Sequence, residues 1–419
     1  MSWRIDAQIL PGRCRSPWTR THRYFRALFL AFCLALVWLP VGAATADDSS
    51  DPAEVWLVTY GPGEIYWQRF GHNAIWIRDP QRGLDHVFNF GFFDFAQENF
   101  LLRFLQGRML YFSAARPARE EFAAYIDETR SIRAQRLALS GSQRAQLTEY
   151  LLREVRPENR DYRYDYYLNN CSTRVRDALD QALGGALSSE FGRLPGQQSW
   201  RDHTRRLTSM DFWLYLGLEI ALGAPVDRPI NAWDEMFIPA LLADAVADLD
   251  VAGAVGPVPL TVEDVMLSES SLPQPPAAPR AWWPRYLLAS LAVLATVAFA
   301  CRLTGAGLAR GLARIWLLIT GLAGLILLFL WLGTDHAVAR MNLNLLVMNP
   351  LWLWPALSPG RTMGALQLAV GFAALALVLP LVPPHQYTFD VLAALLPLNL
   401  AAAMVLHAPR RVAASPAAR

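Results

Sequence analysis

Long apolar runs dominate the C-terminal third of the chain and carry almost no charge. They cover residues 287–301, 315–333, 341–360, 362–389 and 391–408. Spanning a bilayer takes roughly 20 residues, and each run reaches that length alone or with its flanking residues. The pattern predicts an all-α transmembrane bundle of about five helices at residues 285–408, followed by a cytoplasmic tail at residues 409–419.

Arginines at the ends of these runs predict the orientation of the bundle. Arg302, Arg310 and Arg314 follow the first run, Arg361 follows the third, and Arg410 and Arg411 follow the fifth. Basic residues are enriched on the cytoplasmic side of a membrane. With an odd number of spans and an exported segment before the first one, all of these arginines fall in the cytoplasm.

The N-terminal segment predicts that the chain before the first span is exported. Several arginines precede an apolar stretch at residues 27–41, and Ala44-Thr45-Ala46 comes shortly after it. This order is typical of a secretory signal peptide, which we place at residues 1–46. An uncleaved membrane anchor is the alternative, and the segment after residue 46 is exported in either case.

The segment at residues 47–250 has the pattern of a mixed globular domain. Strand-like stretches come first, at residues 54–60, 73–77 and 86–90. A helix is predicted at residues 140–153, where Ser140 precedes an amphipathic stretch, and another helix just after Asn170. The fold class predicted for this segment is therefore α+β, and a linker at residues 251–284, rich in Ser, Pro and Ala toward its end, joins it to the bundle.

The amino-acid composition limits the classes of function that this protein can have. Hydrophobic residues make up 53% of the chain and charged residues 18%, as expected when part of a protein lies in lipid. The formal net charge of +2 argues against a nucleic-acid partner. Neither a His-Glu-x-x-His motif nor paired cysteines are present, so we predict no metal site, and no cofactor is expected.

Cys171 is the candidate nucleophile. Of the four cysteines, it alone falls in the exported domain, so no disulfide forms within that domain. It lies in the first turn of the helix expected after Asn170, where the partial positive charge and free N–H groups of a helix N-terminus stabilise a thiolate. The polar residues Asn169, Asn170, Ser172 and Thr173 surround it in sequence. A buried structural thiol is the alternative.

A thiol nucleophile needs a base, and the exported domain offers His72, His86 and His203. His72 follows Phe70-Gly71 and opens a predicted strand. A histidine in this position can face a helix N-terminus across a cleft. A half-buried strand histidine without chemistry is an equal alternative.

Taken together, these segments resemble a known family. The pattern F-G-H-x-A before N-x-C-S-T-R-x-R-D resembles the circularly permuted papain-like superfamily, which includes lecithin:retinol acyltransferase. It is more closely similar to the Lnb-type lipoprotein N-acyltransferases of bacteria. Residues 88–95, 104–108, 162–177 and 334–350 carry this closer similarity. The resemblance implies a permuted papain-like (NlpC-like) periplasmic domain followed by an inner-membrane bundle.

The resemblance also implies an activity. Cys171 would form an acyl thioester with His72 as base, a membrane phospholipid would be the acyl donor, and a lipoprotein N-terminus would be the acceptor. From the residues alone, we expect only acyl transfer or hydrolysis near a membrane. A papain-like cell-wall amidopeptidase and a non-catalytic envelope scaffold are the alternative hypotheses.

Further residues are predicted at the edge of the site. Asn89 or His86 would orient the imidazole, and because they lie three residues apart on one strand, at most one of them faces His72. We prefer Asn89, with a structural hydrogen bond as the alternative role. His336, Asn342 and Asn344 fall at the periplasmic ends of spans two and three and are candidate substrate contacts, or ordinary interfacial residues.

Overall fold

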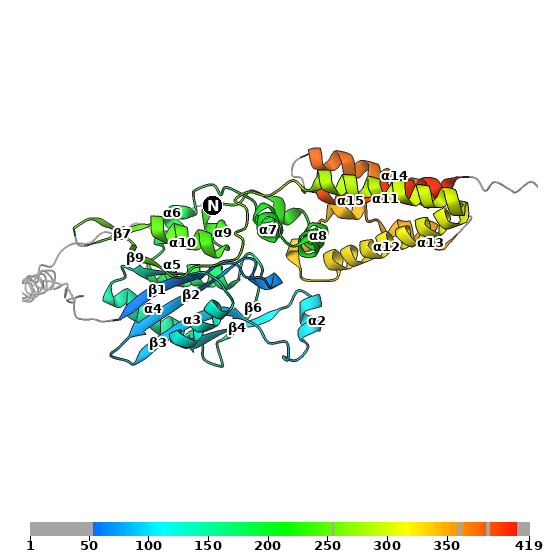
Figure 1. Ribbon diagram of the computed structural model, residues 1–419. Helices are drawn as coiled ribbons and strands as arrows, with labels where there is room; N and C mark the ends of the chain where they lie inside the picture. Colours follow the sequence, from blue (N-terminus) through cyan, green and yellow to red (C-terminus); the bar gives the residue numbers. More distant parts are fainter. Residues whose placement is uncertain (1–52, 254, 359–362, 383–385, 409–419) are drawn as a thin grey trace, which may run out of the picture. The chain divides into compact units, whose positions relative to one another are not determined.

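The computed structural model describes residues 53–253, 255–358, 363–382 and 386–408 (Figure 1). The predicted signal peptide at residues 1–46 and the tail at residues 409–419 lie outside this part of the chain. The described residues form an α+β part followed by a helical part, which confirms the predicted fold class.

A seven-stranded antiparallel sheet lies at the centre of the α+β part, in the order β6-β4-β3-β2-β1-β5-β9. Its strands are β1 (Glu54–Tyr60), β2 (His72–Asp79), β3 (Leu84–Phe92), β4 (Leu110–Pro117), β5 (Ile132–Leu137), β6 (Asp161–Arg163) and β9 (Thr261–Ser268). The first three contain the predicted strands. Two short strands, β7 (Asp250–Ala252) and β8 (Pro257–Pro259), pair separately.

The outer strand β9 lies inside the segment predicted as a linker, so the sheet extends beyond residue 250. Its backbone pairs with β5, and arginines of β5 contact acidic residues of β9: Arg133 Nη2 lies 2.8 Å from Asp264 Oδ2, and Arg136 Nε lies 3.0 Å from Glu263 Oε2. The pairing joins segments about 130 residues apart in sequence, which local patterns do not reveal.

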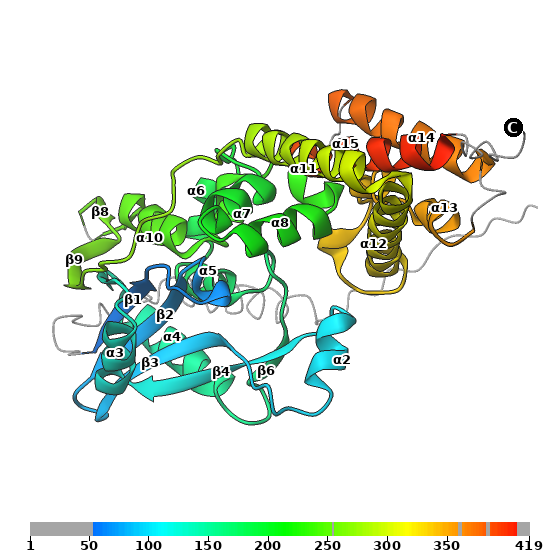
Figure 2. The ribbon, with the colours of Figure 1, turned by 45° about the vertical axis from the view of Figure 1, so that its right-hand side comes forward.

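The α+β part also contains helices, some packed against the sheet and others, such as those labelled α2, α7 and α8, lying beyond it (Figures 1 and 2). They are α2 (Phe100–Leu105), α3 (Ala118–Asp127), α4 (Gly141–Glu154), α5 (Cys171–Ala182), α6 (Ala186–Phe191), α7 (Trp200–Thr208), α8 (Phe212–Ala221), α9 (Ala232–Glu235) and α10 (Pro239–Asp248), with 3₁₀ turns η3 (Tyr66–Gln68) and η4 (Ala224–Asp227). The main core packs Leu57 and Ile75 of the sheet with Val175 and Leu179 of α5 and Leu242 of α10. This packing fixes α5 against the sheet.

The helical part contains α11 (Trp283–Thr304), α12 (Ala306–Leu332), α13 (Leu353–Leu357), α14 (Met363–Val378) and α15 (Phe389–His407), with 3₁₀ turns η5 (Ala337–Ala339), η6 (Leu343–Leu346), η7 (Pro350–Trp352) and η8 (Leu379–Leu381). Within the described residues, three helices are long and apolar enough to cross a membrane, namely α11, α12 and α15. The described part of the run predicted at 341–360 is divided into 3₁₀ turns and the short helix α13, because Asn342 and Asn349 cap backbone N–H groups and proline follows at position 350. The count of five spans stays a prediction.

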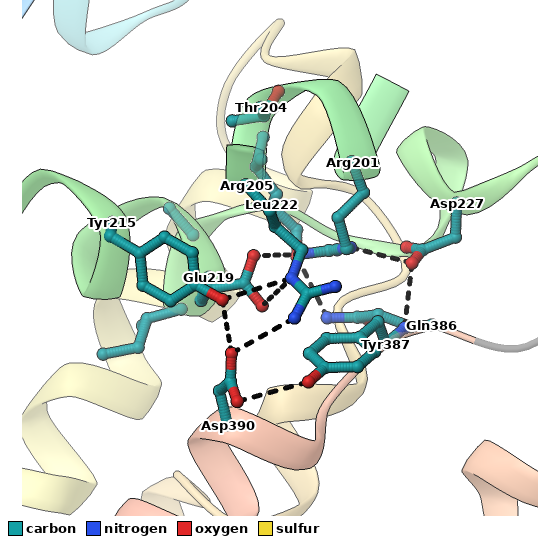
Figure 3. Close-up of polar contacts among 12 residues, drawn as sticks. Arg201, Thr204, Arg205, Tyr215, Glu219, Leu222, Asp227, Gln386, Tyr387 and Asp390 are labelled. Atoms are coloured by element: carbon teal, nitrogen blue, oxygen red, sulfur yellow. Dashed lines mark hydrogen bonds and ion pairs between the residues drawn. The ribbon is translucent and has the colours of Figure 1, made fainter. Parts of the chain in front are cut away.

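Buried charges connect α7 and α8 to the start of α15 (Figure 3). Arg201 Nε donates to Asp227 Oδ1 at 2.8 Å. The Arg205 guanidinium lies 3.7 Å from Glu219 and 3.5 Å from Asp390, and it stacks over the ring of Tyr387. These groups, which we name the charged junction, join segments that lie 185 residues apart in sequence.

Candidate functional site

Cys171 is the first residue of α5, as the sequence predicts. Asn170 caps this helix, because its side chain accepts a hydrogen bond from Thr173 N at 2.9 Å. The next residue, Ser172, ties the first turn to β2, since its Oγ lies 2.8 Å from Asn73 Oδ1. The thiol is thereby held beside the strand residue that follows His72.

Backbone groups approach the sulfur closely. The backbone N–H groups of Asn73, Ser172 and Cys171 act to lower the pKa of the thiol, against the larger opposite effect of burial. On the other side lies Gly91 at the end of β3, with φ +94°. A Cβ at Gly91 would lie 3.4 Å from the Cβ of Cys171, so a larger residue would crowd the thiol as well as strain the backbone.

The imidazole of His72 is oriented by Asn89. Their strands pair so that Ala74 is opposite Asn89, and His72 Nε2 lies 2.9 Å from Asn89 Oδ1. The Nδ2 group of Asn89 donates to Val87 O at 3.2 Å, which fixes the amide orientation. Oδ1 must therefore accept from Nε2–H, and Nδ1 of His72 keeps the lone pair that a base needs. The ring also stacks on Tyr60, with centroids 5.8 Å apart.

Burial favours the neutral forms of the His72 imidazole and the Cys171 thiol. It lowers the pKa of His72 to about 4, although the hydrogen bond to Asn89 opposes this shift. It also raises the pKa of the Cys171 thiol, although the surrounding backbone N–H groups oppose this shift. The resting pair is therefore a neutral thiol and a neutral imidazole. The expected stabilisation of a thiolate by the helix N-terminus is outweighed by desolvation.

The other two histidines of this part occupy different surroundings. His86 lies three residues from Asn89 on β3, where strand alternation turns it to the other face of the sheet, and its Nδ1 is buried without a hydrogen-bond partner. His203 is buried in α7, where its Nε2 lies 2.9 Å from Glu235 Oε1 and its Nδ1 accepts from Arg206 Nε at 3.1 Å. Both ring nitrogens of His203 are thus engaged.

Behind Asn89 lies a carboxylate that sequence reasoning missed. The side chain of Glu121, on α3, is fully buried, lies close to Asn89 and Tyr60, and pairs with Arg116 Nη1 at 3.2 Å. Burial raises its pKa. In the sequence it follows Glu120 in the first turn of a helix, where acidic residues are ordinarily exposed. Its one-turn spacing from Tyr125, whose ring stacks on His72, was the available signal.

Of the three membrane-edge residues predicted as substrate contacts, one lines a cavity. Tyr164, Tyr166, Met109, Arg163 and His336 are among the residues around a cavity of about 360 Å³. Burial raises the pKa of Tyr164 and the charge of a Cys171 thiolate adds to this shift, so this cavity residue lies within electrostatic range of the thiol.

Asn342 and Asn344 are buried elsewhere. Asn342 Nδ2 donates to Ile220 O at 2.8 Å, and Asn344 Nδ2 donates to Glu219 O at 2.8 Å. These bonds satisfy the free carbonyls at the C-terminal end of α8, which is a packing role. Substrate contact by either residue stays a prediction. Among the described residues, no group of three or more His, Cys, Asp or Glu side chains could hold a metal ion.

Comparison with known proteins identifies the two parts. Residues 43–206 match the family model of the Lnb N-terminal periplasmic domain. Residues 278–408 match that of the Lnb transmembrane domain. No match was found among curated proteins or among solved structures. The two family models together cover more than half of the chain, which therefore belongs to the Lnb family and is a membrane protein with a periplasmic domain.

Proposed function

We propose that this protein is a thiol acyltransferase of the bacterial inner membrane. It moves a fatty acyl group from a phospholipid through a Cys171 thioester to an amine, the N-terminus of a lipoprotein. One observation carries the proposal: the thiol lies at the start of a helix whose first turn is tied to β2, the strand that begins with His72, and the proton position of His72 is set by Asn89. Family membership and the membrane helices support lipid and lipoprotein as substrates.

The first half-reaction forms the thioester. Nδ1 of His72 takes the thiol proton as Sγ attacks the ester carbonyl of the phospholipid. Backbone N–H groups around the sulfur stabilise the developing oxyanion. The intermediate collapses with cleavage of the ester C–O bond, and His72 gives its proton to the leaving oxygen, so that the lysophospholipid departs as an alcohol and the imidazole is neutral again.

The second half-reaction forms the amide. The neutral amino group of the acceptor attacks the thioester carbonyl, and His72 accepts a proton from this nitrogen. The C–S bond then breaks, and the thiolate recovers the proton from His72. Because the resting imidazole is neutral, it is ready to act as a base at neutral pH.

Intact-protein mass spectrometry tests the first half-reaction. Full-length protein in phospholipid vesicles without an amine acceptor should gain one fatty-acyl mass, which neutral hydroxylamine removes as expected for a thioester. Cys301→Ser, which removes the other free thiol of the described chain, should acquire the same label, whereas Cys171→Ser should not. Cleavage of peptidoglycan peptides without acylation would favour a cell-wall amidopeptidase. An unlabelled Cys171 that also resists alkylation would favour a scaffold.

A further inference from the structure

The connection between β3 and β4, which contains α2 and extends away from the sheet (Figure 2), carries exposed apolar side chains. The side chains of Phe95, Leu101, Leu102, Phe104 and Leu105 are exposed, Leu101 to 66%. We name these five residues the α2 surface. Within α2 itself, Arg103 is the only charged residue. Adjacent exposed apolar side chains of this kind mark a contact with a partner or with lipid.

The position of α2 next to a membrane helix identifies lipid as its partner. Asp335 N donates to Gln106 O at 2.8 Å, and His336 Nε2 lies 2.9 Å from Phe104 O. The spanning helix α12 ends at Leu332, a few residues before these contacts. The backbone approach is close, because a Cβ at Gly107 would lie 2.7 Å from His336 N. The α2 surface therefore adjoins the point where α12 leaves the bilayer.

A second apolar helix, α8, lies beside α11 and α15, the other two described helices that are long enough to cross a membrane. Phe212 and Trp213 of α8 are exposed, and the ring of Phe212 lies 6.1 Å from that of Tyr286 in the first turn of α11. Helix α8 also contacts α15. Aromatic residues are enriched at the interface between membrane and water. Both short helices thus have the composition and the neighbours of interfacial helices.

A row of aromatic rings leads from the α2 surface to Tyr164, a residue of the cavity. Successive ring centroids are 6.4 Å apart from Phe104 to Phe100, 6.3 Å from Phe100 to Phe93, 5.2 Å from Phe93 to Tyr111 and 4.2 Å from Tyr111 to Tyr164. Tyr164 lines the cavity and lies within electrostatic range of Cys171. An apolar path of this kind suits an acyl chain, because contact with water raises the free energy of the chain.

We propose that the α2 surface lies in the outer leaflet of the membrane, and that the aromatic row behind it guides the donor phospholipid from this leaflet to Cys171. The guiding role rests on the proposed acyl transfer from phospholipid. The immersion of α2 does not rest on acyl transfer, since it follows from the exposure of the apolar side chains of α2 and from the contacts of α2 with the residues after α12. Arg103 then lies where it attracts the phosphate of the lipid.

Immersion is tested without any activity. Full-length protein with its four cysteines replaced by serine receives one nitroxide-labelled cysteine, at Leu102→Cys or, as the control, at Leu267→Cys on β9. The protein is reconstituted in vesicles of phosphatidylethanolamine and phosphatidylglycerol. At position 102, collisions with oxygen should exceed those with a water-soluble nickel complex, and position 267 should show the reverse. A label at 102 that behaves like the one at 267 overturns immersion.

The guiding role is tested by acylation of Cys171. Leu101→Glu with Leu102→Glu should slow acylation by vesicle phospholipid at least about tenfold, because two carboxylates in the leaflet cost well over 1.4 kcal/mol. Acylation by a water-soluble short-chain thioester should be unchanged, which shows an intact thiol site. The matched control, Met266→Glu with Leu267→Glu on β9, replaces two neighbouring exposed apolar residues and should leave both rates unchanged.

The outcomes separate the two proposals. Equal phospholipid rates for the α2 variant and its control overturn the guiding role, even if acyl transfer itself stands. Equal loss with both donors also overturns it, since the damage is then to the thiol site. A wild-type chain that accepts no acyl group from either donor overturns acyl transfer and the guiding role together, while the spin labels still decide whether α2 is immersed.

Discussion

The thiol site and the charged junction both bury polar groups, but the buried groups are neutral at the thiol site and charged at the junction. At the thiol site, burial lowers the pKa of His72 and raises that of Cys171, so both groups are neutral. At the junction, burial opposes the charge on Arg205, but the acidic neighbours prevail, Glu219 foremost, and its pKa stays above the ordinary value. The arginine therefore remains a cation between carboxylates.

This difference separates reactive groups from structural ones. A neutral thiol and imidazole can exchange a proton during a reaction, because no salt bridge holds either in one state. The junction charges are paired across α7, α8 and α15, so removing one leaves the others buried without compensation. Substitutions at the thiol site should thus change rates, whereas those at the junction should change stability.

The largest effect should come from Cys171→Ser. Acylation should fall below detection, because a hydroxyl in this environment is a far poorer nucleophile than a thiol. Thermal unfolding and membrane insertion should match the wild type. Turnover at the wild-type rate in this variant would refute the thioester mechanism.

His72→Ala should lower the acylation rate at least about a hundredfold, the usual size of a general-base contribution. The matched control is His86→Gln, on the neighbouring strand, which should retain most activity. Rates are measured with a soluble thioester donor, so that lipid access does not contribute. A loss of only a few-fold for His72→Ala would assign the base to another residue.

Arg205→Met should act on stability. It removes a cation that lies 3.7 Å from Glu219 and 3.5 Å from Asp390, and the free energy of unfolding should fall by about 3 kcal/mol. Arg78→Met, which breaks an exposed pair with Glu54, should cost less than about 1 kcal/mol. Thermal unfolding in detergent measures both. If Arg205→Met instead abolished acylation in folded protein, the contrast between the two regions would fail.

Asn89→Ala should slow acylation about tenfold, since one hydrogen bond that orients His72 is worth roughly 1.4 kcal/mol at most. The loss should appear in kcat, because Asn89 contacts the base and not the substrate. An unchanged rate would make Asn89 a structural residue of β3.

The smallest effect concerns pH. Since His72 must be neutral to accept the thiol proton, the acid limb of kcat/KM should follow its pKa of about 4 and not the ordinary 6.5. Activity should therefore persist as pH falls through 6.5 and decline only near 4. An acid limb near 6.5 would mean that His72 is more hydrated than its buried position indicates.

Local signals made part of this structure predictable. Ser140 and Asn170 are helix caps that each accept a hydrogen bond from the backbone N–H three residues ahead, so the starts of α4 and α5 could be located from sequence. Strand alternation similarly placed Asn89 and His86 on opposite faces of β3, although it could not decide which one faces His72. The family resemblance, carried by the segments around His72 and Cys171, was confirmed.

The amino-acid order alone was thus enough to predict the α+β and helical parts, the start of α5 at Cys171 and the apolar character of the membrane helices, because each depends on neighbours within a few residues. The pairing of β9, the burial of Glu121 behind Asn89, the assembly of the charged junction, and the packing of Asn342 and Asn344 against α8 became visible only in the folded chain. Contacts between segments far apart in sequence create these features. The same contacts bury the thiol and imidazole, and desolvation then sets their protonation more strongly than the helix N-terminus does.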